Sequence, residues 1–259
     1  MIDIHSHILP GIDDGAPNME TTELFLDLIS GSAVTAVVCT PHYRQGIYHN
    51  EKKYMIEVFQ KTNDLKIAKG YKFQLYCAAE VFLKGESIIT DIQNNAFMIN
   101  GTPFVLVENN FYGFSDDFYI NLYHLVFLGF KPILAHPERY ENIQNNIMLA
   151  EEFMHRDVYL QINTSSILGH NGNKCQAIAL ELIDRGYVHF LGSDCHCRSD
   201  SYDYDLAVEL ISKEFNPKLA NTLALVNPEK MLHNEYIPYF YQSVQTYTPK
   251  KNLFQFFKK

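Results

Sequence analysis

The beginning of the chain carries the residues with the clearest chemical potential. Its alternating apolar residues predict a short strand, which ends at His5 and His7. Residues two apart in a strand project to the same side, so both imidazoles face one place. Asp14 follows in the next loop. Two histidines and an aspartate at the end of a strand can hold a metal ion, although a histidine pair alone also occurs on solvated strands.

Further apolar runs along the chain repeat this pattern. Strands buried on both faces are predicted at 34–39, 73–79, 102–107, 131–135, 158–162 and 188–191. The run 158–162 ends at Asn163. The other runs lead into residues of the types that can bind metal ions. These side chains are His42, Glu80, Glu108, His136, Asp194 and His196.

The segments between these runs show the apolar spacing and the capping residues of helices. Strands that alternate with helices pair in parallel through right-handed crossovers. Seven such strands predict an α/β fold, a closed or nearly closed barrel. In such barrels the active site lies at the C-terminal ends of the strands. All nine candidate metal ligands therefore belong at one mouth of the predicted barrel.

Carboxylates at this mouth argue for cations there. Glu80 and Glu108 each end an apolar strand, and a buried carboxylate without a partner is strongly disfavoured by its lost hydration. The same holds for Asp14 and Asp194. Any single histidine here is more often a hydrogen-bonded loop residue. Carboxylates and imidazoles together, however, fit two or more divalent ions such as manganese, iron or zinc.

The composition limits the classes of function. The chain has 259 residues, 47% of them hydrophobic, which is enough for one domain with a full core. The formal net charge of −9 disfavours a nucleic-acid-binding surface, which should be basic. We expect no signal peptide and no membrane span, since no apolar run approaches ~18 residues. Five dispersed cysteines are unlike a disulfide framework, so we expect a reducing cytoplasm.

The motifs disfavour hydrolysis by a protein nucleophile. A cysteine-dependent phosphatase needs an arginine six positions after its cysteine, and Cys39 comes nearest to this spacing, with Arg44 one place too early. A glycine-rich phosphate loop and a serine nucleophile elbow are also absent from the sequence. Water activated by metal ions is therefore the expected nucleophile, because such ions can lower its pKa from ~15.7 to ~7.

Arginines and aromatic residues near the predicted strand ends suit an anionic substrate that carries a ring. Arg139 follows His136 by three residues and Arg44 follows His42 by two, so both guanidiniums can reach a phosphate. The alternative is a surface arginine paired with a neighbouring carboxylate. The loops also offer apolar and aromatic walls: Ile8, Leu9, Tyr43, Ile47, Tyr48, Phe111, Tyr112, Phe114 and Tyr140.

Taken together, the motifs resemble the PHP (polymerase and histidinol phosphatase) superfamily. Within it they are most similar to the CpsB/YwqE-type protein-tyrosine phosphatases of bacterial capsule and exopolysaccharide operons. The resemblance implies a distorted seven-stranded (β/α) barrel of PHP type. The stretches that carry it are Ile-Asp-Ile-His5-Ser-His7, Asp13-Asp14-Gly15, Thr-Pro-His42, Ala-Glu80, Glu108, Ala-His136-Pro-Glu-Arg139-Tyr140 and Ser-Asp194-Cys-His196.

The resemblance also implies a cofactor of two to three divalent ions, with manganese expected and iron or zinc as alternatives. Glu80 would bridge two of the ions. The implied ligands are His5, His7, Glu80 and Asp194 for the first ion, Glu80, Glu108 and His136 for the second, and Asp14, His42 and His196 for the third.

The implied substrate is phosphotyrosine on the C-terminal tail of a membrane-associated tyrosine kinase. Arg139, His42 and His196 are the expected catalytic residues. Arg139, Arg44, Arg198 and Tyr140 are expected to contact the substrate. One departure concerns Arg198, because relatives are expected to carry the corresponding arginine several residues farther along the chain.

The C-terminal part of the chain differs from the rest. We expect residues 1–232 to form the phosphatase barrel and residues 233–259 to form a tail that is aromatic and basic. This tail can fold back over the barrel, join copies of the chain in a homo-oligomer, or contact an anionic membrane. The last alternative would bring a cytoplasmic protein to the inner face of the membrane.

Competing functions remain open from the sequence. The leading hypothesis is a metal-dependent protein-tyrosine phosphatase. The first rival is a small-molecule phosphatase of the same superfamily that acts like a histidinol phosphatase. A nucleic-acid phosphoesterase is disfavoured by the net charge. A non-enzymatic partner of the kinase would need a dead metal site, although every ligand position is filled.

Overall fold

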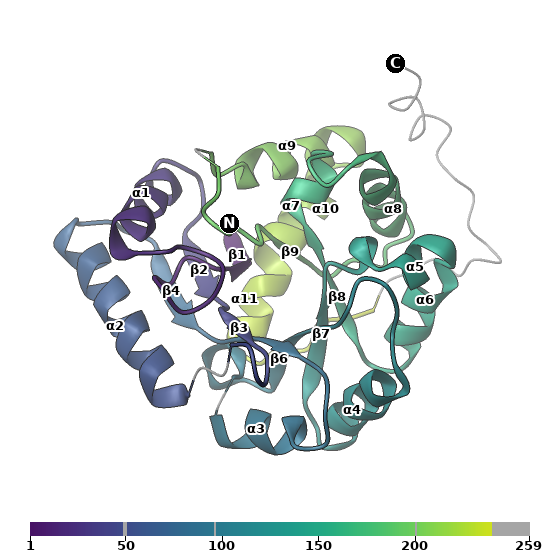
Figure 1. The fold of residues 1–259 in the computed structure, drawn as a ribbon. Helices are drawn as coiled ribbons and strands as arrows, with labels where there is room; N and C mark the ends of the chain where they lie inside the picture. Colours follow the sequence, from purple (N-terminus) through teal and green to yellow (C-terminus); the bar gives the residue numbers. More distant parts are fainter. Residues whose placement is uncertain (49–50, 96, 200, 240–259) are drawn as a thin grey trace.

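The structure is a computed structural model that describes residues 1–48, 51–95, 97–199 and 201–239. Parallel strands lie at the centre and helices surround them (Figure 1). The strands are β1 (Ile2–Ser6), β2 (Ala36–Cys39), β3 (His42–Tyr43), β4 (Gln74–Cys77), β5 (Glu80–Phe82), β6 (Phe104–Glu108), β7 (Lys131–Ala135), β8 (Tyr159–Asn163) and β9 (Phe190–Gly192). The predicted α/β fold is confirmed.

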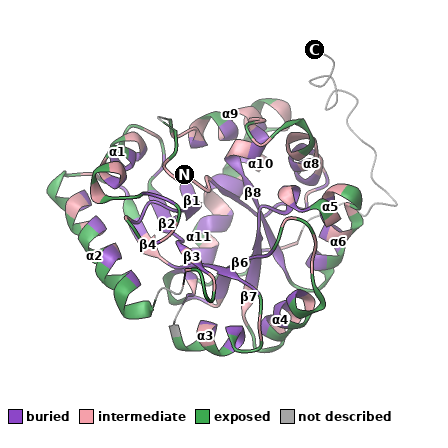
Figure 2. Ribbon diagram, in the orientation of Figure 1, coloured by how far each residue is buried: buried purple, intermediate pink, exposed green. Residues whose placement is uncertain are grey.

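Helices connect the strands and cover their outer side. Their buried faces turn inward and their exposed faces turn to solvent (Figure 2). They are α1 (Met19–Ser30), α2 (Lys52–Ala68), α3 (Ile88–Asn95), α4 (Asp116–Phe127), α5 (Glu141–Asn145), α6 (Met148–His155), α7 (Thr164–Ile167), α8 (Asn173–Asp184), α9 (Tyr204–Glu214), α10 (Pro217–Asn221) and α11 (Asn227–Leu232).

The strands form two sheets where one sheet of seven strands was expected. The first has the order β1-β2-β4 and the second the order β3-β5-β6-β7-β8-β9. The chain passes directly from β2 to β3 through Thr40 and Pro41, and from β4 to β5 through two alanines. Pro41 has no N–H to donate to a sheet, which accounts for the break at this point. The Glu80 N–H still donates to the Pro41 carbonyl at 3.1 Å, so the two sheets remain in contact.

The opposite edges of the two sheets also meet. Ser6 and Cys195 form a parallel bridge, and the Asp194 N–H donates to the His5 carbonyl at 2.8 Å. These contacts bring the loop after β9 against the end of β1. The strands therefore curl into a compact arrangement whose C-terminal ends converge.

Alternation along the strands separates two apolar regions. On β6, Phe104 and Leu106 belong to an inner cluster, whereas Val105 and Val107 pack with the surrounding helices. The inner cluster consists of Ile2, Ile4, Ala36, Val38, Ala78, Ile99, Phe104, Leu106, Ile133, Ala135, Tyr159, Phe190, Met231, Leu232 and Ile237. Its last members come from α11 and the segment after it, so the end of the chain's described part fills the bottom of the fold.

The described part of the predicted tail packs against the strands. Ile237 is fully buried, and the ring of Tyr239 stacks on Tyr159 with centroids 4.7 Å apart. The Tyr159 hydroxyl donates to the Ile237 carbonyl at 3.3 Å. Residues 240–259 lie outside the described residues, so a separate tail at 233–259 stays a prediction. No helix among the described residues is long and apolar enough to cross a membrane.

Candidate metal centre and phosphate pocket

The nine candidate ligands converge where the strands end. The side chains of three groups place one ligand atom each within 4.8 Å of the others. These groups are His5, His7, Glu80 and Asp194; His42, Glu80 and Glu108; and His7, Asp14, His42 and His196. The groups hold eight of the nine candidates and His136 contacts Glu80 beside them, so we call all nine residues the His–carboxylate cluster. Glu80, His7 and His42 each belong to two groups, and the two carboxylate oxygens of Glu80 suit a bridging ligand.

The first group is fully buried apart from a small exposed edge of Asp194. His5 Nε2 lies 3.0 Å from His7 Nε2. The same His5 atom lies 3.3 Å from Glu80 Oε2 and 3.4 Å from Asp194 Oδ1. Four ligand atoms thus surround one point, in the number that a tetrahedral ion binds.

The second group is built around Glu80. His42 Nδ1 lies 3.0 Å from Glu80 Oε2 and 3.1 Å from Glu108 Oε1. His136 is the third ligand expected here, and its Nε2 lies 2.9 Å from Glu80 Oε1. His136 therefore contacts the bridging carboxylate but is not within the compact group that His42 joins.

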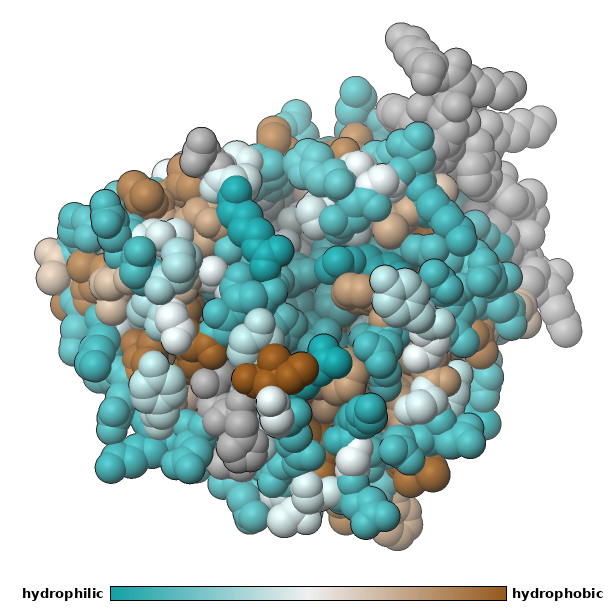
Figure 3. Space-filling model, in the orientation of Figure 1, coloured by the Kyte–Doolittle hydropathy of each residue, from teal (hydrophilic) through white to brown (hydrophobic). Residues whose placement is uncertain are grey.

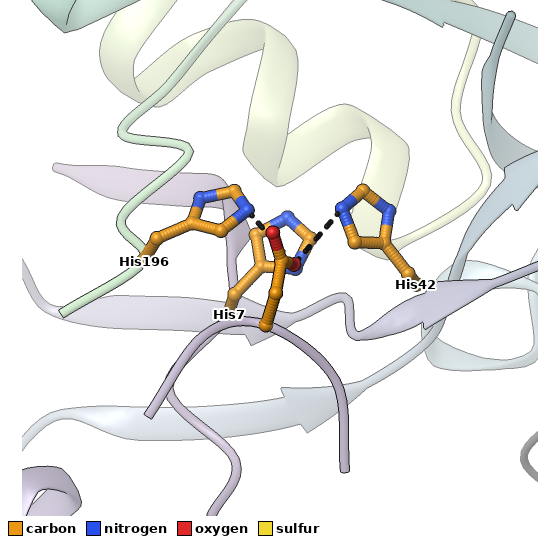
Figure 4. A group of neighbouring side chains, drawn as sticks. His7, His42 and His196 are labelled. Carbon is orange, nitrogen blue, oxygen red and sulfur yellow. Dashed lines mark ion pairs between the residues drawn. The ribbon is translucent and has the colours of Figure 1, made fainter. Parts of the chain in front are cut away.

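The third group lies nearest to solvent. Asp14 Oδ1 is 3.4 Å from His42 Nε2 and 3.3 Å from His196 Nε2. The rings of His7 and His196 stack with centroids 4.1 Å apart. Figure 4 shows these three rings around the Asp14 carboxylate, with the two ion pairs dashed.

The electrostatics of the cluster match a site for cations. Burial alone would raise the pKa of Glu80, but His5 and His42 hold that pKa well below its usual range. Burial alone would lower the pKa of His42, but Glu80 and Glu108 raise it to about 10. The carboxylates thus favour positive charge at the points where the imidazole nitrogens meet. A metal ion would supply that charge, because metal binding requires neutral imidazole and releases protons.

Neighbouring residues hold the ligands in place. Asp13 Oδ2 lies 2.8 Å from His7 Nδ1 and accepts from the His42 N–H at 2.9 Å. Gly15 lies against His7, where an added Cβ would be 2.0 Å from the His7 carbonyl oxygen. Asp194 has a φ of +52°, a strained conformation that is common at functional sites.

Two polar residues on β8, Gln161 and Asn163, were not predicted to take part in the site. Gln161 Oε1 lies 2.9 Å from His5 Nδ1, and Asn163 Nδ2 donates to Asp194 Oδ2 at 2.6 Å. Both are fully buried. The sequence contained a clue, because two polar residues alternate within an otherwise apolar strand.

A cavity of about 620 Å³ opens above the cluster. The surface there is hollowed and mainly hydrophilic, with hydrophobic side chains at one edge (Figure 3). Asp14, His42, Glu108, His136, Asp194 and His196 line it together with the three predicted arginines, Arg44, Arg139 and Arg198. His170, which had no predicted role, also lines it.

Comparison with known proteins identifies the family. Residues 1–233 match the family model described as capsular polysaccharide synthesis, CpsB/CapC. The chain belongs to the CpsB/CapC family. The tyrosine-protein phosphatase YwqE of Bacillus subtilis is 29% identical over 258 residues, covering 99% of this chain and 100% of YwqE. The putative tyrosine-protein phosphatase CapC of Staphylococcus aureus is 34% identical over 200 residues, or 76% of this chain and 77% of CapC.

Solved structures agree with this assignment. A crystal structure from work on YwqE of Bacillus subtilis and CpsB of Streptococcus pneumoniae, described as unique metal-dependent tyrosine phosphatases, matches with a TM-score of 0.86. The match has 28% identity and covers 93% of this chain and 97% of the other. A histidinol phosphate phosphatase from Lactococcus lactis matches with a TM-score of 0.53 at 15% identity, which shows a shared fold alone.

In this CpsB/CapC protein each arginine of the cavity has a partner that orients it. Arg139 Nη1 lies 3.2 Å from Asp194 Oδ2, and its guanidinium lies over the Phe111 ring at 4.3 Å. Arg44 lies over the Phe82 ring at 4.1 Å. Arg198 donates to the outer oxygen of Asp14 at 2.8 Å, so it lies beside the third group although its sequence position departs from the expected one.

The structure places Tyr140 and several predicted walls away from the cavity surface. Tyr140 is fully buried and its hydroxyl accepts from the Asn109 N–H at 3.1 Å, so it packs behind Phe111 and His136 and does not line the cavity. Among the other predicted walls, Ile47, Tyr48 and Phe111 line the cavity. The remaining residues lie in the core or away from the cavity: Ile8, Leu9, Tyr43, Tyr112 and Phe114.

The surroundings of the cysteines do not indicate a catalytic thiol. All five are free, and burial raises the pKa of the Cys39 thiol well above its usual range. Cys195 and Cys197 line the cavity on either side of His196. A reactive cysteine needs a lowered pKa, whereas burial raises the pKa of the Cys77 and Cys175 thiols as well.

Proposed function

We propose that this chain is a metal-dependent protein-tyrosine phosphatase that acts on a bacterial tyrosine kinase in capsular or exopolysaccharide synthesis. The observation that carries the proposal is the meeting of the His–carboxylate cluster with Arg44, Arg139 and Arg198 around one cavity. Such a cavity suits a phosphate monoester. The names of the relatives support phosphotyrosine as that monoester.

The metal cofactor follows from the donor set. The first ion would be held by His5, His7, Glu80 and Asp194, the second by Glu80, Glu108 and His136, and the third by Asp14, His42 and His196. We propose three divalent ions, with manganese favoured by the mixture of imidazole and carboxylate ligands and with iron or zinc as alternatives. Bound ions would lower the pKa of water and neutralise charge that develops on the phosphoryl group.

The chain's own side chains would orient the phosphate. Arg139 presents a planar guanidinium, held by Phe111 and Asp194, that can donate two parallel hydrogen bonds to phosphate oxygens. His42 and His196 are 15% and 18% exposed, whereas His5 and His7 are fully buried. The two partly exposed histidines would therefore lie beside the reacting phosphate.

The substrate's ring would lie between the walls of the cavity. Ile47 and Tyr48 come from the loop after β3, and Phe111 comes from the loop after β6. Aromatic contacts add ~0.5–1.5 kcal/mol each beyond burial of area. Phosphoserine has no ring to gain this energy, so these walls supply a preference for phosphotyrosine.

The wider assignment follows from the family. The kinase tail is the expected partner, because the relatives are named tyrosine-protein phosphatases and the family model is described as capsular polysaccharide synthesis. We also propose that the two sheets act as one distorted barrel of seven strand positions, with β2–β3 and β4–β5 each counted once. A membrane contact through the tail at 233–259 stays a prediction.

A comparison of three substrates tests the proposal. Protein loaded with Mn²⁺ should hydrolyse a phosphotyrosine peptide with kcat/KM at least about fivefold above that for the phosphoserine peptide of the same sequence, given two or more ring contacts. Histidinol phosphate is the third substrate, because it represents the rival small-molecule activity. A clear preference for histidinol phosphate, or equal rates on both peptides, would contradict the proposal.

A further inference from the structure

A chain of hydrogen bonds joins two members of the His–carboxylate cluster through β8. His5 Nδ1 lies 2.9 Å from Gln161 Oε1. Gln161 Nε2 donates to Asn163 Oδ1 at 2.9 Å, and Asn163 Nδ2 donates to Asp194 Oδ2 at 2.6 Å. The side chains of His5, Gln161 and Asn163 are fully buried, so solvent does not compete for these bonds.

The carboxylate at one end fixes the direction of every bond. An ionised Asp194 can only accept, and Arg139 also donates to the same oxygen. Asn163 must therefore turn its NH₂ to Asp194 and its carbonyl to Gln161. Gln161 must then donate with its NH₂ and turn its own carbonyl to His5. His5 must donate in turn, so its Nδ1 carries the proton.

This order prepares His5 as a ligand. With the proton on Nδ1, the lone pair of Nε2 points to Glu80, His7 and Asp194, all within 3.4 Å. We propose that Gln161 and Asn163 are positioning residues, which fix the tautomer of His5 and the orientation of Asp194 for metal binding. The inference rests on the metal centre of the proposed function.

The surrounding backbone leaves room for this chain of hydrogen bonds. Gly192 on the neighbouring β9 leaves the space that Gln161 occupies, since an added Cβ would lie 2.8 Å from Gln161 Nε2 and 2.6 Å from His5 Cβ. Tyr159 of the inner cluster, Gln161 and Asn163 are two residues apart along β8, so their side chains project to the same side of the strand. β8 thus contributes to the site without supplying a metal ligand.

Metal affinity provides the first test. We expect Gln161→Leu to weaken Mn²⁺ binding by about 10- to 100-fold, the effect typical of losing the partner of a ligating histidine. Titration calorimetry of metal-free protein with Mn²⁺ alone measures it. Asn163→Ser, which cannot span from Gln161 to Asp194, serves as a second variant and should weaken binding in the same direction.

A matched control separates positioning from stability. Asn121 is also a buried amide, and it donates to the Gly85 carbonyl at 3.2 Å outside the cluster. Asn121→Leu should lower the free energy of unfolding without changing the affinity for Mn²⁺. Wild-type affinity in a folded Gln161→Leu or Asn163→Ser protein would overturn the inference.

The protonated nitrogen of His5 can be observed directly. In ¹⁵N-labelled protein loaded with Zn²⁺, we expect a protected Nδ1–H signal from His5 in the wild type and in Asn121→Leu. The signal should be lost or exchange rapidly in Gln161→Leu, and its persistence there would overturn the inference. Neither readout uses phosphotyrosine, so a protein that passes both tests but fails to hydrolyse phosphotyrosine would contradict only the proposed function.

Discussion

Three histidines of the cluster, His5, His7 and His196, share one arrangement, in which Nδ1 is held by the protein and Nε2 faces the centre. Nδ1 of His5 contacts Gln161, and Nδ1 of His7 contacts Asp13. Nδ1 of His196 lies 2.9 Å from the Asp194 carbonyl. Partners of this kind orient ligand rings and select their tautomers, so a search for ligands alone describes only half of such a site.

Arg139 is the side chain outside the nine ligands whose loss should most affect the chemistry. We expect Arg139→Ala to lower kcat on a phosphotyrosine peptide by about 10²- to 10³-fold, as when one donor to a developing oxyanion is removed. The content of bound Mn²⁺ should be unchanged. Steady-state kinetics together with metal analysis checks both points.

Arg156 provides the control for Arg139. It also lies over an aromatic ring, that of Tyr123 at 4.7 Å, and it pairs with Glu152 at 3.2 Å, but it lies on the outer surface. Arg156→Ala should leave kcat within about twofold, because exposed ion pairs contribute little. Equal kinetics for the two variants would make Arg139 an ordinary surface arginine.

His189 lies at the opposite end of the strands and makes stability depend on pH. Its Nδ1 accepts from the Leu160 N–H at 3.2 Å, and burial lowers its pKa from 6.5 to about 3. The unfolded chain binds the proton near pH 6.5, whereas the folded chain binds it only near pH 3. The stabilisation is thus complete above pH 6.5 and is lost as the pH falls from 6.5 toward 3.

His189→Asn keeps an acceptor for the Leu160 N–H but cannot titrate. Between about pH 7 and about pH 5, the stability of the wild type should fall by about 2 kcal/mol relative to this variant. Urea unfolding of both proteins without metal measures the difference, and the comparison cancels the titration of the cluster. Parallel pH profiles of the two proteins would show that folding does not lower the pKa of His189.

At the scale of the elements, tight loops at the strand ends decide where ligands lie. We expect Gly15→Ala to destabilise the protein by about 1–3 kcal/mol and to weaken Mn²⁺ binding, because its Cβ would clash with His7. Gly31→Ala is the matched control, since its nearest atom would be at an ordinary 3.5 Å. Unfolding and Mn²⁺ titration compare the two, and similar behaviour of both variants would refute the clash.

The loop after β3 carries the wall for the substrate's ring. Arg44 and Tyr48 exchange backbone hydrogen bonds of 3.0 and 2.8 Å, and the Tyr48 ring stacks on His42 at 5.7 Å. Tyr48→Ala should raise KM for a phosphotyrosine peptide by about 2- to 12-fold, which corresponds to one lost aromatic contact.

Tyr112→Ala is the control for this wall, because Tyr112 is 84% exposed and does not line the cavity. Its kinetics should match those of the wild type. The same rise of KM in both variants, or no rise in Tyr48→Ala, would remove the Tyr48 ring from substrate recognition.

The convergence of the residues at the strand ends could be predicted from the sequence. Apolar runs that each end in a ligand-type residue must bring those residues together once the strands pair in parallel, and His5 through His196 do converge. The sequence could not predict how deeply each side chain is buried. Tyr140 and Tyr43 follow strands as Tyr48 does, but only the packing of α-helices and loops decides which ring is buried.

At the scale of the whole molecule, the sequence predicted the alternation of strands and helices but not the two sheets. The interruption at Pro41 follows from its missing N–H, whereas the break before Glu80 has no such residue and depends on the path of β2 beside it. The burial of Ile237 under the strands was also not predicted, because a single isoleucine in an aromatic segment shows no period.

The most direct test is the hydrolysis of a phosphotyrosine peptide before and after removal of metal. The protein is stripped with a chelator, its metal content is checked by mass spectrometry, and Mn²⁺ is then added back. We predict that kcat/KM falls to background in the stripped protein and returns with Mn²⁺, in the wild type and in Cys39→Ala alike. Full activity in metal-free protein, or activity that disappears in a folded Cys39→Ala variant, would contradict it.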